Sequence, residues 1–142
     1  MFYYVSITVT PAANPRTLFQ AYTSTNQQAK IHGIDIGMEG GTPASSPILF
    51  DWCVQSSAGD GLPATAFLQD RTSSITVQTT LQKTFTAEPT LDSTIINFSL
   101  HQQGTAFWRP PFPIILKDSE RIGLRYLSST FVSVALTVYM EE

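Results

Sequence analysis

The fold is decided by the stretch RIGLRYLSSTFVSVALTVYM, residues 121–140. Apolar residues alternate with small or polar ones from Phe131 to Met140, which is the period of a β-strand with one side on a core. The predicted inward residues of this strand are Val132, Val134, Leu136, Val138 and Met140. Ile122, Leu124 and Tyr126 alternate in the same way one strand earlier. We predict that the long last strand lies inside a sheet, since a central strand buries the most surface.

The rest of the chain repeats this alternation in short runs. Predicted strands cover residues 2–9, 18–22, 34–38, 48–55, 75–81, 94–100, 106–109 and 113–116. They recur at about 8–12 residues without a convincing amphipathic helix, which is typical of an all-β sandwich or barrel. Residues 64–68 fit either a helical turn or a short strand, and residues 40–47 predict a flexible loop. Two polar linkers, residues 117–120 and 128–130, are short enough for hairpin turns.

The whole chain, residues 1–142, is predicted to form one domain, since no linker separates parts of different composition. Its predicted fold class is all-β, a single antiparallel β-sandwich or jelly roll of about 8–10 strands. Residues 1–10 are predicted to form an edge strand or an arm that contacts a neighbouring subunit. No run approaches the roughly 20 apolar residues of a membrane span. The start of the sequence also lacks the pattern of a signal peptide. We therefore expect a protein made in the cytosol that has no membrane partner.

Charged residues make up only 13% of the chain, about half the usual share. The surface is therefore either covered largely by Ser, Thr, Gln and Asn or partly buried against other chains, as suits a subunit of an assembly. The net charge of −3 and the eight scattered Lys and Arg residues form no basic patch, so we expect no nucleic-acid partner. The single cysteine, Cys53, excludes an intrachain disulfide and a cysteine zinc cluster. Its apolar surroundings in the sequence predict a small core residue.

Signals for catalysis or metal binding are weak. The two histidines, His32 and His101, lack the spacing of a metal site. His32 is predicted to share a strand face with the apolar residues of the run 34–38, as a satisfied interior or interface histidine. Asp35 and Asp51 lie on neighbouring predicted strands and are interpreted as solvated, outward-facing acids rather than a catalytic pair. We predict no enzymatic activity, no cofactor and no metal.

Two aromatic segments are the candidate interaction sites. The segment from Trp108 to Pro113 contains prolines that cannot join a sheet ladder, so it is predicted to run along an edge. It is either a contact surface, since aromatic residues and Arg dominate interface hot spots, or a rigid connection whose Phe107 and Phe112 plug one end of the core. The N-terminal aromatic segment is either an edge strand or a contact arm. The candidate interface residues are Phe2, Tyr3, Tyr4, Phe107, Trp108, Arg109 and Phe112.

The second half of the chain contains three further features. They are Pro113 to Leu116 with Glu120 to Arg125 before the long last strand, the run Phe85-Thr86-Ala87-Glu88-Pro89-Thr90, and Gln103-Gly104 before Ala106-Phe107. The ending resembles the last strands of tumour-necrosis-factor-like and C1q-like jelly rolls. Together, the three features resemble more closely a group of small virion proteins of tailed bacteriophages. The likeness covers roughly the second half of the chain, with looser agreement in the first.

This resemblance implies a capsid decoration (cement) protein. Such a protein is a jelly roll, typically a homotrimer, that lies on the outer capsid surface and clamps neighbouring major capsid proteins. It would be assembled in the host cytoplasm, and the resemblance brings no catalytic residues with it. The physics agrees, because a subunit that bridges several capsomers adds buried area that must be lost before the shell opens.

Two other functions fit the same sequence. A receptor- or carbohydrate-binding jelly roll of a phage head or tail fibre would need an exposed aromatic platform flanked by Asn, Gln or Asp. Trp52 beside Asp51 is interpreted as a core residue instead, because its strand is apolar on both faces. The lack of a coiled-coil or triple-β stalk disfavours the tail-fibre form. A small cupin-like enzyme would need a stoichiometric metal. The sequence does not distinguish a trimer from a dimer.

Overall fold

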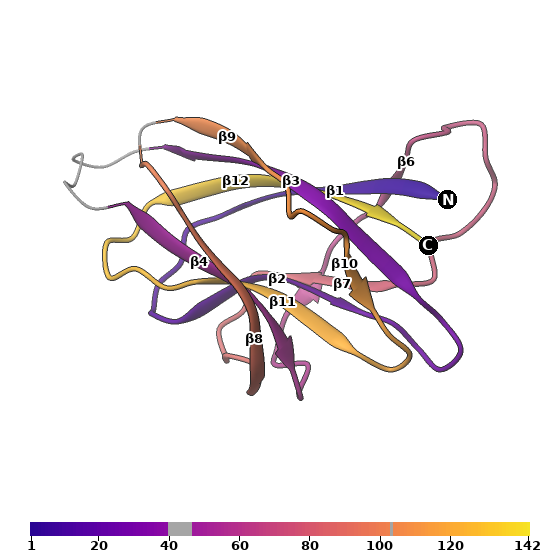
Figure 1. Cartoon of the computed structure of the whole chain (residues 1–142), viewed down its shortest axis with the longest axis horizontal. Coiled ribbons are helices and arrows are strands. Elements are labelled where there is room, and N and C mark those ends of the chain that lie inside the picture. The colour runs from indigo at the N-terminus through magenta and orange to yellow at the C-terminus, as the bar shows by residue number, and fades with distance from the viewer. Residues whose placement is uncertain (40–46, 103) are drawn as a thin grey trace.

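The computed structural model describes residues 1–39, 47–102 and 104–142. Its strands are β1 (Phe2–Val9), β2 (Arg16–Tyr22), β3 (Ala29–Glu39), β4 (Ile48–Gln55), β5 (Leu62–Pro63), β6 (Phe67–Leu68), β7 (Thr80–Lys83), β8 (Leu91–Leu100), β9 (Thr105–Trp108), β10 (Ile114–Leu116), β11 (Arg121–Tyr126) and β12 (Ser133–Glu141). They form two antiparallel sheets packed as a sandwich, as predicted (Figure 1). The described part of the chain has no helix long and apolar enough to cross a membrane.

The first sheet, called sheet I below, has the order β10-β3-β12-β1-β6, and β9 also pairs with β3. The second, sheet II, has the order β5-β7-β2-β11-β4-β8. β1 pairs with β12 along its full length from Phe2 to Val9, so this segment belongs to the chain's own sheet. On its other side, β1 meets the short strand β6 only at Tyr3 and Tyr4.

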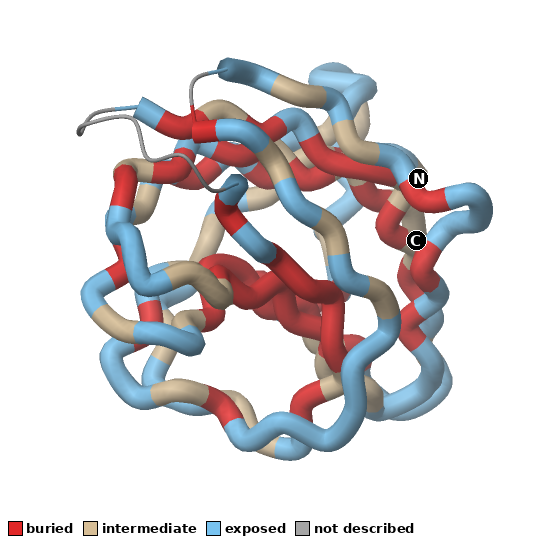
Figure 2. Tube along the Cα trace, turned by 60° about the vertical axis from the view of Figure 1, so that its left-hand side comes forward, coloured by how far each residue is buried: buried red, intermediate tan, exposed pale blue. Residues whose placement is uncertain are grey.

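The predicted inward face of the last strand is confirmed, in the middle of sheet I. β12 lies between β3 and β1, and Val134, Leu136 and Val138 are buried. β11 has the corresponding place in sheet II, between β2 and β4, where Ile122 and Leu124 are buried. Buried segments accordingly face each other across the sandwich (Figure 2). Burying each of these aliphatic side chains stabilises the fold by about 1.5–3 kcal/mol.

The expectation that the last linkers close hairpins is wrong. β10 and β12 lie in sheet I but β11 lies in sheet II, so residues 117–120 and 128–130 each connect strands of different sheets (Figure 1). Each crossing lets the next strand turn its apolar face toward the opposite sheet. The period of a strand defines its inward face but not the sheet it joins. A short linker can close a hairpin within one sheet or connect strands of two different sheets.

Two other strand predictions change. The strand expected over residues 75–81 begins only at Thr80, the first residue of β7. Just before it, the Glu142 carboxylate accepts hydrogen bonds from the backbone N–H groups of Gln78 and Thr79, at 2.6 and 3.0 Å, in place of a neighbouring strand. The ambiguous residues 64–68 join β5 to β6 and end in β6 itself, without a helical turn. Of the predicted loop 40–47, residues 40–46 lie outside the described residues.

His32 does not share a face with the apolar residues of its strand, contrary to the prediction. In the pairing of β3 with β12, Gly33 is opposite Tyr139 and Ile31 is opposite Met140, so His32 is the extra residue of a β-bulge. The bulge shifts the alternation by one residue. Ile31 on one side of it is therefore buried, and His32 is half-buried on the outer face.

The chain itself covers the part of sheet II around β2. The run Phe85–Thr90 forms a strap that side chains of the sheet and the preceding loop hold in place. The Glu88 carboxylate accepts hydrogen bonds from the Thr17 backbone N–H at 2.7 Å and from its hydroxyl at 2.5 Å. The Asp60 carboxylate accepts from the backbone N–H groups of Thr86 and Ala87, both at 2.8 Å. The sequence feature that resembled phage proteins is thus an architectural element of this sheet.

A buried polar network lies on the same side of sheet II. The Gln20 side-chain amide donates to the Gln55 carbonyl oxygen at 2.7 Å, and the Gln55 amide donates to the Thr17 hydroxyl at 2.8 Å. Arg125 donates from Nε and Nη2 to the two carboxylate oxygens of Asp51, at 2.9 and 2.5 Å. The Arg125 guanidinium and the Asp51 carboxylate are therefore held in a fixed geometry, away from solvent.

Asp51 corrects a prediction, because only 1% of it is exposed and it is not a solvated acid. It also lies in a different sheet from Asp35. The next two residues of β4 were predicted to be core residues. This is confirmed, since Trp52 and Cys53 are fully buried. Burial, with the charge of Asp51 as the next cause, raises the pKa of the Cys53 thiol to about 12.

The substitution Asp51→Ala tests the buried pair. It leaves the Arg125 guanidinium buried without its counter-ion, and we expect the free energy of unfolding in urea to fall by about 3–5 kcal/mol. Asp92→Ala on the exposed strand β8 is the matched control, with an expected change within about 0.5 kcal/mol. A loss for Asp51→Ala no larger than that of the control would contradict this account.

Candidate interaction site on the outer face of sheet I

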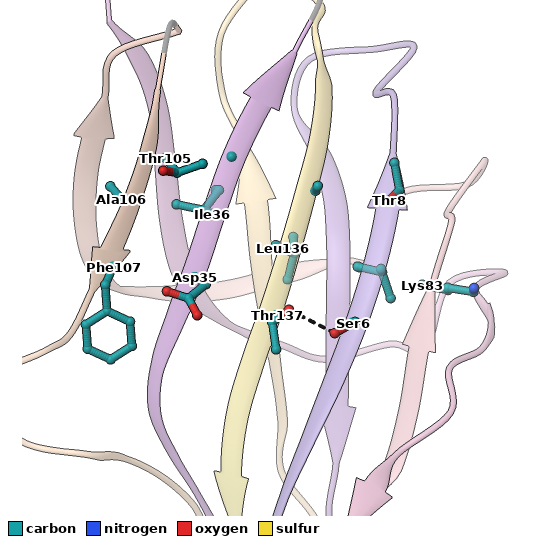
Figure 3. A pocket seen from close by; sticks show the side chains of 13 residues that line it. Ser6, Thr8, Asp35, Ile36, Lys83, Thr105, Ala106, Phe107, Leu136 and Thr137 are labelled. Atoms are coloured by element: carbon teal, nitrogen blue, oxygen red, sulfur yellow. Dashed lines mark hydrogen bonds between the residues drawn. The ribbon is translucent and has the colours of Figure 1, made fainter.

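The outer face of sheet I is open and hollowed. β9, β3, β12 and β1 lie side by side, and alternate residues of each strand point away from the core (Figure 3). A shallow groove of about 720 Å³ crosses these strands. The residues that line it are mostly small or hydroxylated, and they include Ser6, Thr8, Gly37, Thr105, Ala135 and Thr137. The Ser6 and Thr137 hydroxyls are hydrogen bonded at 2.8 Å, so β1 and β12 are joined through side chains as well as backbone.

A second, more apolar hollow lies on the same face and shares Phe107 with the groove. We call it the aromatic hollow; its volume is about 510 Å³. Its lining includes Phe2, Tyr4, His32, Phe107, Arg109 and Tyr139. The hollow thus brings together the two aromatic segments that the sequence analysis singled out separately.

Ring contacts within the chain position the walls of the hollow. The rings of Phe107 and Tyr139 meet edge to face with centroids 6.1 Å apart, and Phe2 lies 5.6 Å from the ring of His32. Tyr4 stacks on Phe67 of β6 at 5.7 Å. These distances fall in the range of favourable aromatic pairs. The aromatic walls are therefore fixed before any partner arrives.

Hydrogen bonds hold two polar groups at the hollow. The Tyr139 hydroxyl donates to the Asp35 carboxylate at 2.5 Å, and this bond raises the pKa of the Tyr139 phenol above its ordinary value. His32 Nε2 lies 2.8 Å from the Glu141 carboxylate, with Lys30 Nζ at 3.7 Å from the same group. The hydrogen bond from His32 holds the pKa of Glu141 below its ordinary value.

A glycine allows the aromatic wall to approach β3 closely. A Cβ atom at Gly33 would lie 2.9 Å from the Trp108 carbonyl oxygen and 3.2 Å from Cζ of Phe107. A larger residue would push β9 away from β3. Gly33 therefore sets the depth of the hollow beside Phe107.

The structure separates the predicted interface residues into three groups. Phe2, Tyr4, Phe107 and Arg109 line the aromatic hollow. Tyr3 also contributes to its lining, but Tyr3 is only 2% exposed and belongs to the core. Trp108 and Phe112 have other roles.

The alternative prediction, in which Phe107 and Phe112 plug one end of the core, is wrong. Phe107 is 59% exposed and Phe112 is 81% exposed. The residue that packs against the core is Trp108, half-buried with its ring stacked on Phe98 at 4.4 Å. The prediction of an edge is confirmed, since β9 and β10, on either side of the prolines, both pair with β3.

Sequence reasoning missed His32, Asp35 and Tyr139 as parts of this site. A signal existed for Tyr139, because the alternation of the last strand places its side chain on the outer face, away from the buried Val138 and Met140. No signal existed for His32, whose orientation depends on the bulge.

Comparison with known proteins found no relative of this chain. No family model, no curated protein and no solved structure matches the chain. Within the described residues, no group of three or more His, Cys, Asp or Glu side chains is arranged to hold a metal ion.

The substitution Asp35→Asn tests the hydrogen bond at the hollow. A carboxylate acceptor favours the neutral phenol, so its removal should lower the pKa of Tyr139 toward the ordinary value of about 10. Because the folded-state pKa is raised, the stabilisation from this bond is present below about pH 10 and is lost as the pH rises through the folded-state pKa. An NMR titration of ¹³C-labelled tyrosine measures the shift. Asp92→Asn is the control, and an unchanged Tyr139 titration in Asp35→Asn would refute the assignment.

Proposed function

We propose that this chain is a non-enzymatic structural protein of a bacteriophage virion, a capsid decoration protein. In this proposal it binds the outer surface of the major capsid protein shell and stabilises the head. It acts as a homotrimer and uses the outer face of sheet I to contact neighbouring chains. It needs no cofactor.

The observation that carries this proposal is the chemistry of the outer face of sheet I. Phe2 and Phe107, far apart in the sequence, are 51% and 59% exposed on one side of the sandwich. Exposed apolar patches of this kind mark interaction sites. The core of protein interfaces is enriched in aromatic residues and Arg and depleted of other charges, which is the composition of the aromatic hollow.

The strand order supports the jelly-roll part of the proposal. Apart from the short strands β5 to β7, the chain alternates between the sheets from β1 to β4 and again from β8 to β12, with β9 and β10 sharing one layer. Jelly rolls are likewise built from strands that cross between two packed sheets. This agrees with the resemblance of residues 113–140 to jelly-roll endings.

The proposed action is mechanical. A packaged genome presses outward on its shell, and the shell opens only when contacts between capsomers are lost. A subunit that spans two or more capsomers adds interface area, and stable contacts bury about 1,200–2,000 Å². The groove and the hollow provide a continuous low-charge surface for one part of that area.

A receptor- or carbohydrate-binding module is the second candidate. The observation in its favour is the size of the aromatic hollow, about 510 Å³, with Gln69 and Arg109 as polar groups beside the aromatic walls. Sugars stack on such walls. Binding to a glycan array by the isolated chain, abolished by Phe107→Ala, would favour this function over the structural one.

The double substitution Phe2→Ser with Tyr4→Ser tests the proposed function. Tyr3 is left in place because it belongs to the core, and deletion of residues 2–4 would remove it. Capsid shells assembled without this protein are mixed with it and sedimented. We expect the wild-type chain to co-sediment and raise the temperature at which the shells open, and the double variant to bind at least about tenfold more weakly.

The matched control for this experiment is Phe131→Ser, which removes a ring that is 44% exposed outside the aromatic hollow. It should bind shells like the wild type, and circular dichroism should show that both variants are folded. Failure of the wild-type chain to bind shells would overturn the proposed function. Equal binding by the double variant would show that another surface makes the contact.

A further inference from the structure

We propose that Phe112 of one copy inserts into the aromatic hollow of the next copy. This inference rests on the self-association in the proposed function and names the contact that produces it. The interface is then of the head-to-tail type, in which each copy presents one projecting ring and one hollow.

Phe112 is the projecting part. It is the most exposed large apolar residue of the described chain, at 81%. Pro110, Pro111 and Pro113 surround it, and proline restricts the backbone so that the ring is presented without a large loss of conformational freedom. Pro110 is buried, which anchors the base of this connection, and β9 and β10 attach its two ends to β3. The ring is thus held outward on a rigid support.

The aromatic hollow is the receiving part. Its volume of about 510 Å³ is large enough for a phenyl ring, and its walls at Phe2, Tyr4, Phe107 and Tyr139 offer ring faces and edges to it. The chain's own Phe112 does not fill this space, because it is 81% exposed and is not part of the lining. A second copy provides the missing ring with the chemistry that the hollow favours.

The charges around the two parts are complementary. Arg109 is exposed on the segment that carries Phe112, and Asp35 is exposed beside the Phe107 and Tyr139 wall. No ion pair among the described residues uses either of them. We place the Arg109 of the incoming copy against the Asp35 carboxylate of the receiving copy, beside the hollow that the receiving copy's own Arg109 also lines.

The two parts lie close together in each copy. Arg109 lines the hollow and Phe112 follows only three residues later, so their Cα atoms lie within about 10–11 Å of each other. Projection and hollow are therefore neighbours rather than opposite ends of the chain. A head-to-tail contact closes into a ring when the rotation between copies completes a full turn, and the proposed homotrimer requires this closure.

The first test is Phe112→Ala, with Phe131→Ala as the matched control at another exposed ring. Light scattering over a range of concentrations measures the association of the wild type, whose chain mass is 15.6 kDa. We expect Phe112→Ala to weaken association more than about tenfold while its circular dichroism spectrum stays that of the wild type. Phe131→Ala should associate normally. Unchanged association of Phe112→Ala would overturn the contact.

The second test places cysteines at the two ends of the contact. Pro111→Cys, which keeps the Phe112 ring, and Gln69→Cys, which lies at the hollow, are made as separate proteins and then mixed under air with a copper catalyst. The native Cys53 is fully buried and stays unreactive. We expect a disulfide-linked dimer with one chain of each kind only in the mixture, since neither protein alone brings two new thiols together. No cross-link in the mixture would overturn the contact.

These outcomes separate this inference from the proposed function. A wild-type chain that binds shells but stays at 15.6 kDa overturns the contact alone. A wild-type chain that neither binds shells nor associates overturns both.

Discussion

The structure depends on burying the inward faces of β11 and β12 against each other. Each strand is the centre of its sheet, and each alternates so that every second side chain enters the shared core. Because this constraint fixes two layers, each remaining strand must add to one edge or the other. The two outward faces are then free to differ, and we propose that this difference gives the chain its interaction side.

On sheet II, the chain itself satisfies several buried polar groups, whereas large aromatic rings stay exposed on the outer face of sheet I. On sheet II, the strap at residues 85–90 and the pair Asp51–Arg125 occupy the polar groups that would otherwise bind water or a partner. On sheet I, the groove and the aromatic hollow stay exposed, although Phe107 and Phe2 are as apolar as many core residues. We propose that partners bind through sheet I, since burial of these exposed rings is favourable.

Much of the fold follows from the sequence, but the meeting of distant segments does not. Alternation predicted β12 and its inward residues, since that pattern is local. The assignment of β11 to the other sheet, the bulge at His32 and the burial of Asp51 depend on neighbours that a single strand does not specify. The residues at 2–4 and 107–109 were both candidates for contact from their composition alone. Their convergence requires the order β9-β3-β12-β1, which only the structure provides.

We propose that the outer face of sheet I is the interaction face. A cryo-electron microscopy map of the chain bound to the proposed capsid shell tests this most directly. The account predicts three copies around a three-fold axis, with the aromatic hollow covered by a neighbouring chain and the strap side of sheet II away from that contact. A map in which the aromatic hollow faces solvent, with the copies held through sheet II, would contradict it.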